Sequence, residues 1–125
     1  MVEEPEGVRT LYVTFPSEEQ ARTICSTLVK EGLAACANVF PVWSVYRWKG
    51  VVEGHGESAA LLKTTAAGVP ALEGRIVELH PYETPCIVAS GPEGAFDPYR
   101  AWVEQSVTPG RRPRGGGTTG KGRGH

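Results

Sequence analysis

Residues 8–30, VRTLYVTFPSEEQARTICSTLVK, contain the clearest structural pattern in the chain. The β-branched and aromatic residues of 8–15 predict a strand, which the following proline ends. Ser17 is a favourable N-cap, and Gln20 three positions later completes a capping box. Apolar residues then recur at the spacing of one helical face, which predicts a helix that stops near Gly32.

The remaining sequence predicts five more elements around this strand and helix. Pro41 predicts a bulge or break in the second strand, and Gly54-His55-Gly56 predicts a second bulge or turn. The order is β-α-β-β-α-β with a short terminal helix, which predicts an α+β, ferredoxin-like sandwich whose far sheet face is uncovered unless subunits meet there. The expected strands are 34–49, 51–65 and 85–90, and the expected helices begin at Pro70 and Pro98, the latter with Asp97 as N-cap.

Composition divides the 125-residue chain into a domain and a tail. Residues 109–125 hold five of the thirteen basic residues, seven of the sixteen glycines and no acidic residue, so residues 1–108 carry a formal net charge of −6. We expect one folded domain over 1–108 and a disordered, basic, glycine-rich tail over 109–125. No apolar run could span a bilayer and no secretory signal opens the chain, which predicts a cytoplasmic protein without a membrane partner.

Common catalytic and cofactor motifs are missing from the sequence. Cys25, Cys36 and Cys86 form no C-x-x-C pair, so we expect free, buried thiols. Residues 115–122 have the spacing of a phosphate-binding loop, but glycine replaces the final Ser or Thr and no helix can follow. There is no G-x-S-x-G or H-E-x-x-H motif. A cysteine nucleophile paired in space with a histidine base stays open as a catalytic arrangement, because one sequence does not show spatial pairs. Apart from that, we predict that the protein is not an enzyme.

A histidine, a phenol and a carboxylate lie between two prolines in residues 80–85, HPYETP. The prolines stiffen this connection between helix and strand, and polar groups on a rigid loop are good candidates for binding. Alternatively, His80 caps the preceding helix, because an imidazole near a helix C-terminus interacts favourably with the helix dipole. The residues alone leave both interpretations open.

Residues 43–49, WSVYRWK, combine aromatic and basic side chains on a predicted strand. Such a stretch can stack on single-stranded nucleic acid, but the net negative charge of 1–108 argues against nucleic acid as a partner. Trp, Tyr and Arg are also enriched at protein interfaces. We therefore expect an interface formed by Trp43, Tyr46, Arg47 and Trp48.

Five segments form a further pattern along the chain, and together they resemble the CutA family of divalent-cation tolerance proteins. The match covers about residues 10–107 in the family's order and spacing, and the tail lies outside it. The segments are LAACAN at 33–38, SVYRWKG at 44–50, KTT at 63–65, ELHPYETP at 78–85, and Tyr99 with Trp102.

The resemblance implies a fold, an assembly and a role. CutA proteins have the β-α-β-β-α-β fold and form compact homotrimers like the P-II nitrogen-signalling proteins, in which the long hairpin extends each sheet into the next subunit. They are associated with tolerance to copper and other divalent ions, and no accepted catalytic activity belongs to the family. By resemblance, residues 43–48 form a trimer interface, and Tyr82 and Lys63 line a ligand cleft between subunits.

The resemblance carries over only part of a metal site. The copper ligands assigned in the family are a cysteine at the end of the first strand and two adjacent histidines, and the matching positions here are Val13, Leu79 and His80. One histidine makes a poor copper site. We expect weak binding of copper or another divalent cation through His80 and Glu83, which fades as pH falls through about 6.5 because neutral imidazole is the ligand.

Two functions follow from these expectations. The first is a trimeric, non-enzymatic protein of divalent-cation tolerance or response that binds metal or a small ligand at clefts between subunits. The alternative is a structural scaffold whose trimer presents the basic tails of residues 109–125 to acidic partners.

Overall fold

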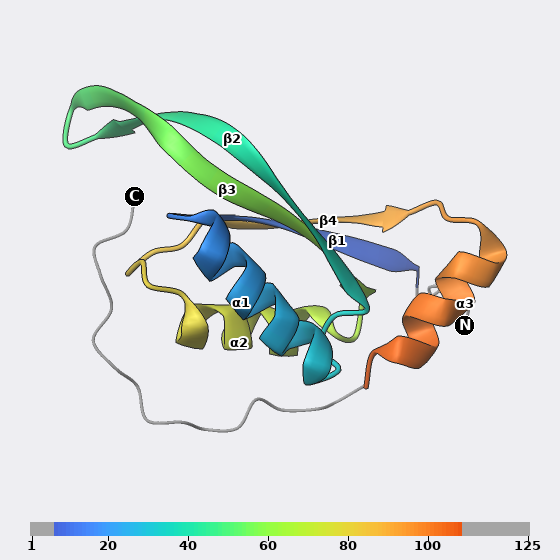
Figure 1. The fold of residues 1–125 in the computed structure, drawn as a ribbon. Coiled ribbons are helices and arrows are strands. Elements are labelled where there is room, and N and C mark those ends of the chain that lie inside the picture. The colour runs from blue at the N-terminus through green and yellow to red at the C-terminus, as the bar shows by residue number, and fades with distance from the viewer. Residues whose placement is uncertain (1–6, 109–125) are drawn as a thin grey trace.

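The computed structural model describes residues 7–108, and they form one four-stranded antiparallel sheet with three helices (Figure 1). The strand order is β2-β3-β1-β4, so the two strands of each β-α-β unit are separated by one strand of the other unit. This order confirms the predicted α+β, ferredoxin-like arrangement. The elements are β1 (Val8–Phe15), α1 (Glu18–Lys30), β2 (Cys36–Trp48), β3 (Val51–Thr65), α2 (Val69–Leu79), β4 (Ile87–Glu93) and α3 (Asp97–Ser106).

The first strand and helix form as their sequence predicts. Ser17 is the N-cap of α1, and its hydroxyl accepts a hydrogen bond from the Gln20 N–H at 3.1 Å. The helix ends at Lys30 with Glu31 as its C-cap, and the next residue, Gly32, has a φ of 76°, the left-handed conformation that glycine adopts most readily. Both boundaries are therefore set by local chemistry.

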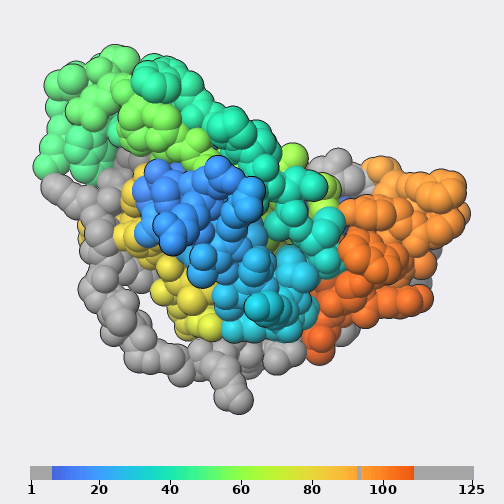
Figure 2. Space-filling view, in the orientation of Figure 1, coloured from blue at the N-terminus to red at the C-terminus, as the bar shows by residue number. Residues whose placement is uncertain are grey.

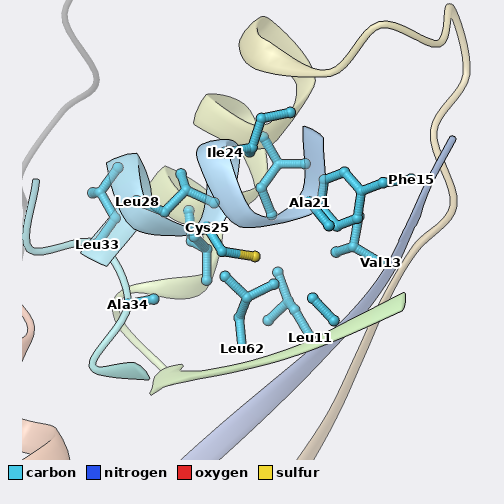
Figure 3. Close-up of a cluster of buried hydrophobic side chains, with 13 residues drawn as sticks. Leu11, Val13, Phe15, Ala21, Ile24, Cys25, Leu28, Leu33, Ala34 and Leu62 are labelled. Atoms are coloured by element: carbon cyan, nitrogen blue, oxygen red, sulfur yellow. The ribbon is translucent and has the colours of Figure 1, made fainter. Parts of the chain in front are cut away.

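The main core lies between the sheet and the helices α1 and α2. Figure 3 shows α1 directing its apolar stripe, including Ile24, Cys25 and Leu28, toward the side chains of Leu11 and Leu62 on β1 and β3. Cys25 is buried among these side chains, as predicted. Because side chains alternate along a strand, every second residue of β1 and β3 points away from this core.

Within residues 7–108, the sheet face away from α1 and α2 is covered at one end only. Val103 and Val107 of α3 and its C-terminal junction pack with Val8 and Ala35 in a second, smaller buried cluster. The expectation of a wholly uncovered face is therefore corrected, because the terminal helix closes the end of the sheet opposite the β2–β3 hairpin (Figure 1).

The β2–β3 hairpin is a long, regular arm. It turns at Lys49 and Gly50, both with positive φ (52° and 82°), which suits the twist of a two-residue hairpin. The predicted interruption at Pro41 is wrong: the pairing runs through it without a shift, because β2 is an edge strand that tolerates proline. The predicted bulge at residues 54–56 is also wrong. Gly54 instead makes room for the Trp43 indole, whose Nε1 would lie 3.1 Å from a Cβ there.

Arg75 of α2 is half-buried and forms ion pairs with Glu31, just beyond α1, at 2.8 Å and with Glu78 at 3.0 Å. One predicted detail of the third helix differs. The third helix includes Asp97, and Phe96 occupies the N-cap position. Asp97 bonds instead to Arg100 one turn later. The predicted tail, residues 109–125, lies outside the described residues.

Candidate functional site

A group of polar side chains gathers where the hairpin leaves the body of the sheet; it consists of Ser44, Tyr46, His55, Glu57 and Tyr82, and we call it the hairpin-base cluster. The side chain of Glu57 is 0% exposed. One carboxylate oxygen accepts a hydrogen bond from Ser44 Oγ at 2.5 Å, and the other accepts one from the Tyr82 hydroxyl at 2.7 Å. The buried carboxylate of Glu57 on β3 is therefore hydrogen-bonded both to β2 and to the loop before β4.

An imidazole completes the cluster. His55 Nε2 lies 3.8 Å from a Glu57 carboxylate oxygen, and its Nδ1 lies 3.1 Å from the Tyr46 hydroxyl. The rings of Tyr46 and His55 meet edge to face, with centroids 5.4 Å apart. His55 and Glu57 share a strand face because they are two residues apart. Two metal-ligating types, an imidazole and a carboxylate, are therefore adjacent in one protomer.

The negative charge of Glu57 affects the surrounding phenols. Burial, together with the hydrogen bond to Glu57, raises the pKa of Tyr82 well above its usual range. Burial raises the pKa of Tyr12 and Tyr46 as well, and Glu57 contributes to both shifts. These phenols are therefore protonated at neutral pH, and the Tyr82 hydroxyl donates to the acid.

His80 is buried beside this cluster instead of lining an open cleft. His80 is only 1% exposed, and its ring stacks on Phe15 with the ring centroids 5.0 Å apart. The carbonyl of Thr14 lies 2.7 Å from Nε2 and can only accept, so Nε2 carries the proton. Nδ1 then accepts the Tyr82 N–H at 3.1 Å. In this arrangement neither ring nitrogen offers a lone pair to an ion.

The other expected metal ligand, Glu83, is exposed on the same loop. Within residues 7–108 no group of three or more His, Cys, Asp or Glu side chains is placed to hold a metal ion. The positions matched by resemblance to family ligands are apolar: Val13 is fully buried in the core and Leu79 packs against it. The donor set of one protomer therefore does not make a complete cation site.

The two residues expected to share a ligand cleft lie apart in the protomer. Tyr82 contacts the hairpin-base cluster, whereas Lys63 lies opposite Thr10 and Cys36 toward the α3 end of the sheet. There Lys63 lines a separate cavity beside Tyr99.

The expected interface residues lie on the hairpin arm, which projects from the body of the molecule (Figure 2). Trp43 is 69% exposed, and Arg47 is also exposed. Tyr46 and Trp48 are half-buried on the opposite strand face; Tyr46 bonds to His55, and the Lys49 ammonium lies 5.7 Å from the Trp48 ring. Further exposed apolar side chains on the arm are Val45, Val51 and Val52.

Glu57 and His55 were not predicted as site residues from the sequence. A signal for them exists: a carboxylate and an imidazole two residues apart share one strand face, just before the apolar run at 59–62. Their partners Ser44 and Tyr82 are remote in sequence, so only the folded chain shows that the acid is buried and hydrogen-bonded.

Comparison with known proteins agrees with this fold. The model of the family described as CutA1 divalent ion tolerance protein matches residues 9–106. The divalent-cation tolerance protein CutA of Thermus thermophilus is 44% identical over 96 residues, which cover 76% of this chain and 93% of that protein. Mouse protein CutA is 38% identical over 102 residues, 81% of this chain but only 58% of the mouse protein, so this chain spans little more than half of that relative.

Solved structures extend the comparison. The structure of the Thermus thermophilus divalent cation tolerance protein has a TM-score of 0.78 at 41% identity, covering 81% of this chain and 99% of that chain. The Archaeoglobus fulgidus protein, described as a periplasmic divalent cation tolerance protein CutA, also has a TM-score of 0.78, at 33% identity and with coverage of 81% and 99%.

The fold and the hairpin-base cluster define a ferredoxin-like α+β protein with a long hairpin arm and a buried, hydrogen-bonded carboxylate at its base. With the match over nearly the whole described region, the chain belongs to the CutA1 divalent ion tolerance protein family. Among the helices of the described residues, none has the length and apolar character needed to cross a membrane.

Proposed function

We propose that this chain is a non-enzymatic, self-associating protein of divalent-cation tolerance, which binds a cation or small ligand where copies of the chain meet. The observation that carries the proposal is the hairpin-base cluster, in which a wholly buried carboxylate lies 3.8 Å from an imidazole at the base of an exposed apolar arm. The family membership supports the role in cation tolerance. A cytoplasmic location stays part of the proposal.

Homotrimer formation is supported by the surface of the arm. Large exposed apolar side chains in one place mark interaction sites, and Trp43 and Val45 are 69% and 65% exposed. The outer edges of β2 and β4 are also unpaired among the described residues, and cyclic closure would cover such edges.

Light scattering tests this assembly. We expect a mass about three times 13.4 kDa for the full chain. Trp43→Ser should lower the mass, whereas Trp102→Ser, which changes an exposed tryptophan on α3 instead of the arm, should not. A monomeric wild-type protein would rule out the assembly.

The proposed cation site needs donors from a second copy. His55 and Glu57 could supply two donors in one chain if their hydrogen bonds with Tyr46, Ser44 and Tyr82 rearranged. Glu83 is an exposed carboxylate on the neighbouring loop, and His80 could contribute only if Tyr82 N–H released its Nδ1. Borderline cations such as Cu²⁺ and Zn²⁺ accept imidazole and carboxylate together. We therefore expect cation binding that depends on assembly.

Calorimetric titration with copper and zinc tests the site. The protein should carry His125→Ala, because a terminal histidine in a glycine-rich segment can bind copper by itself. His55→Ala and Glu57→Gln should weaken binding, Trp43→Ser should abolish it with the assembly, and Arg22→Ala on the outer surface of α1 should leave it unchanged. Equal binding in all four variants would remove the cation role. The alternative scaffold function depends on residues 109–125, which the structure does not describe.

A further inference from the structure

The Tyr82 side chain covers the buried acid of the hairpin-base cluster. Its hydroxyl donates to Glu57 Oε2 at 2.7 Å, and Ser44 Oγ donates to the other carboxylate oxygen at 2.5 Å. The Glu57 side chain is 0% exposed. A group that arrives from solvent therefore reaches neither oxygen unless one of these covering side chains moves.

The oxygen bonded to Tyr82 is also the one nearest the imidazole. His55 Nε2 lies 3.8 Å from Glu57 Oε2. Two ligand atoms that are each about 2.1 Å from one zinc ion lie at most about 4.2 Å apart, so this pair has the spacing of two ligands of one cation. The Tyr46 hydroxyl, 3.1 Å from His55 Nδ1, can accept a hydrogen bond from Nδ1–H, which leaves a lone pair on Nε2. A cation shared with His55 therefore needs Oε2.

A cation and the Tyr82 hydroxyl compete for this oxygen. Zinc lies about 2.0–2.2 Å from a carboxylate ligand, closer than the 2.7 Å at which the hydroxyl oxygen of Tyr82 lies. Burial and the hydrogen bond to Glu57 raise the pKa of Tyr82 well above its usual range, which disfavours the phenolate that would be a ligand itself. Since a hydrogen bond to an ionised acceptor is among the stronger kinds, breaking it lowers the affinity for the cation.

The loop that carries Tyr82 has a second attachment, which does not involve the hydroxyl. The Tyr82 N–H donates to His80 Nδ1 at 3.1 Å, and His80 Nε2 donates to the Thr14 carbonyl at 2.7 Å. The backbone at Tyr82 can therefore remain attached to β1 while the side chain releases Glu57.

We propose that Tyr82 is an internal competitor of the cation, because its hydroxyl holds Glu57 Oε2 until a divalent cation shared with His55 displaces it. This inference rests on the proposed cation role of the hairpin-base cluster. Its consequence is a site with lowered affinity, which fills only when the cation is abundant, as suits a protein of cation tolerance.

Calorimetric titration of the full chain with zinc, in the His125→Ala background, tests the competition. Tyr82→Phe removes only the hydroxyl and should strengthen zinc binding about tenfold, with the mass in light scattering unchanged. Adding Glu57→Gln to Tyr82→Phe should remove this gain. Tyr99→Phe is the matched control: it removes a hydroxyl that contacts Cys36 instead of Glu57, and zinc affinity should not change.

Nuclear magnetic resonance of protein labelled with carbon-13 at the tyrosine Cζ tests the displacement directly. The chain has four tyrosines, and the signal that is missing from Tyr82→Phe belongs to Tyr82. Saturating zinc should shift this signal, because Cζ carries the hydroxyl that loses its bond to the carboxylate. The Tyr99 signal, assigned in the same way from Tyr99→Phe, should stay in place.

The outcomes separate this inference from the proposed function. A gain in affinity below about threefold, a gain that comes with a changed mass or persists with Glu57→Gln, or an unmoved Tyr82 signal would each overturn the competition. Wild-type zinc binding that Glu57→Gln weakens would still support the cation role in those cases. If neither the wild type nor Tyr82→Phe binds zinc, both proposals are wrong.

Discussion

Replacing His80 by alanine should destabilise the protein severely, because this histidine is a structural part of the fold in each protomer. The change removes the hydrogen bonds to the Thr14 carbonyl at 2.7 Å and from the Tyr82 N–H at 3.1 Å. Each is worth about 1 kcal/mol net, and more where the remaining group stays buried. The stack on Phe15, with centroids 5.0 Å apart, adds about 1 kcal/mol. We expect a loss of about 3 kcal/mol in the free energy of unfolding.

Urea unfolding at a fixed protein concentration measures this loss, since self-association makes apparent stability depend on concentration. For a domain of this size, 3 kcal/mol corresponds to a fall in Tm of about 15 °C. Glu83→Ala, an exposed change on the same loop, is the matched control and should shift stability by less than about 0.5 kcal/mol. If His80→Ala and Glu83→Ala unfold alike, the imidazole does not hold the loop to β1 and the reasoning fails.

Two further predictions concern packing and burial. Gly68→Ala should destabilise the protein by about 1–3 kcal/mol through overpacking, because the new Cβ would lie 2.5 Å from Thr64 Oγ1. Gly74→Ala meets nothing within 4 Å inside α2 and should stabilise the protein by about 0.5–1 kcal/mol. Thermal unfolding of both variants checks these opposite signs. Burial raises the pKa of the Cys25 thiol to about 11, so Cys25 should be unreactive toward a thiol reagent at pH 8 until urea unfolds the chain. Because the folded-state pKa exceeds the ordinary value of 9.0, this thiol's contribution to stability is complete below pH 9 and is lost between about pH 9 and 11.

The order of the elements could be predicted from sequence because local chemistry sets it. The Ser17 cap and the positive φ at Gly32 define α1 at both ends, and the element order then leaves few topologies. The failures at Pro41 and Gly54 share one cause. Both residues were expected to interrupt a strand. Pro41 is tolerated because β2 is an edge strand, and Gly54 is needed because a side chain there would meet the Trp43 indole. Both facts depend on strand neighbours, which one sequence does not reveal.

The candidate site was harder to predict because burial decides the role of each group. His80 was selected as a ligand because it is a histidine on a stiff loop. In the structure its ring stacks on Phe15 and its Nε2 donates to the Thr14 carbonyl, and both partners are more than sixty residues away in sequence. Glu57 was overlooked because a lone acid in a strand usually faces water. Its burial follows from Ser44 and Tyr82, which approach it only after the hairpin and the loop have folded.

The sheet face away from α1 and α2 has opposite charges at its two ends, Glu57 near the hairpin and Lys63 near α3. These residues lie six positions apart on β3, about 20 Å at 3.3 Å per residue. This distance is more than twice the screening length of about 8 Å at physiological salt, so the charge of Lys63 should not influence a cation bound at the hairpin base. Lys63→Met should therefore leave copper binding unchanged in the titration described above. A change in copper affinity larger than about twofold would show that the two ends are coupled, either through β3 or through the assembly, because changes at separate sites otherwise add.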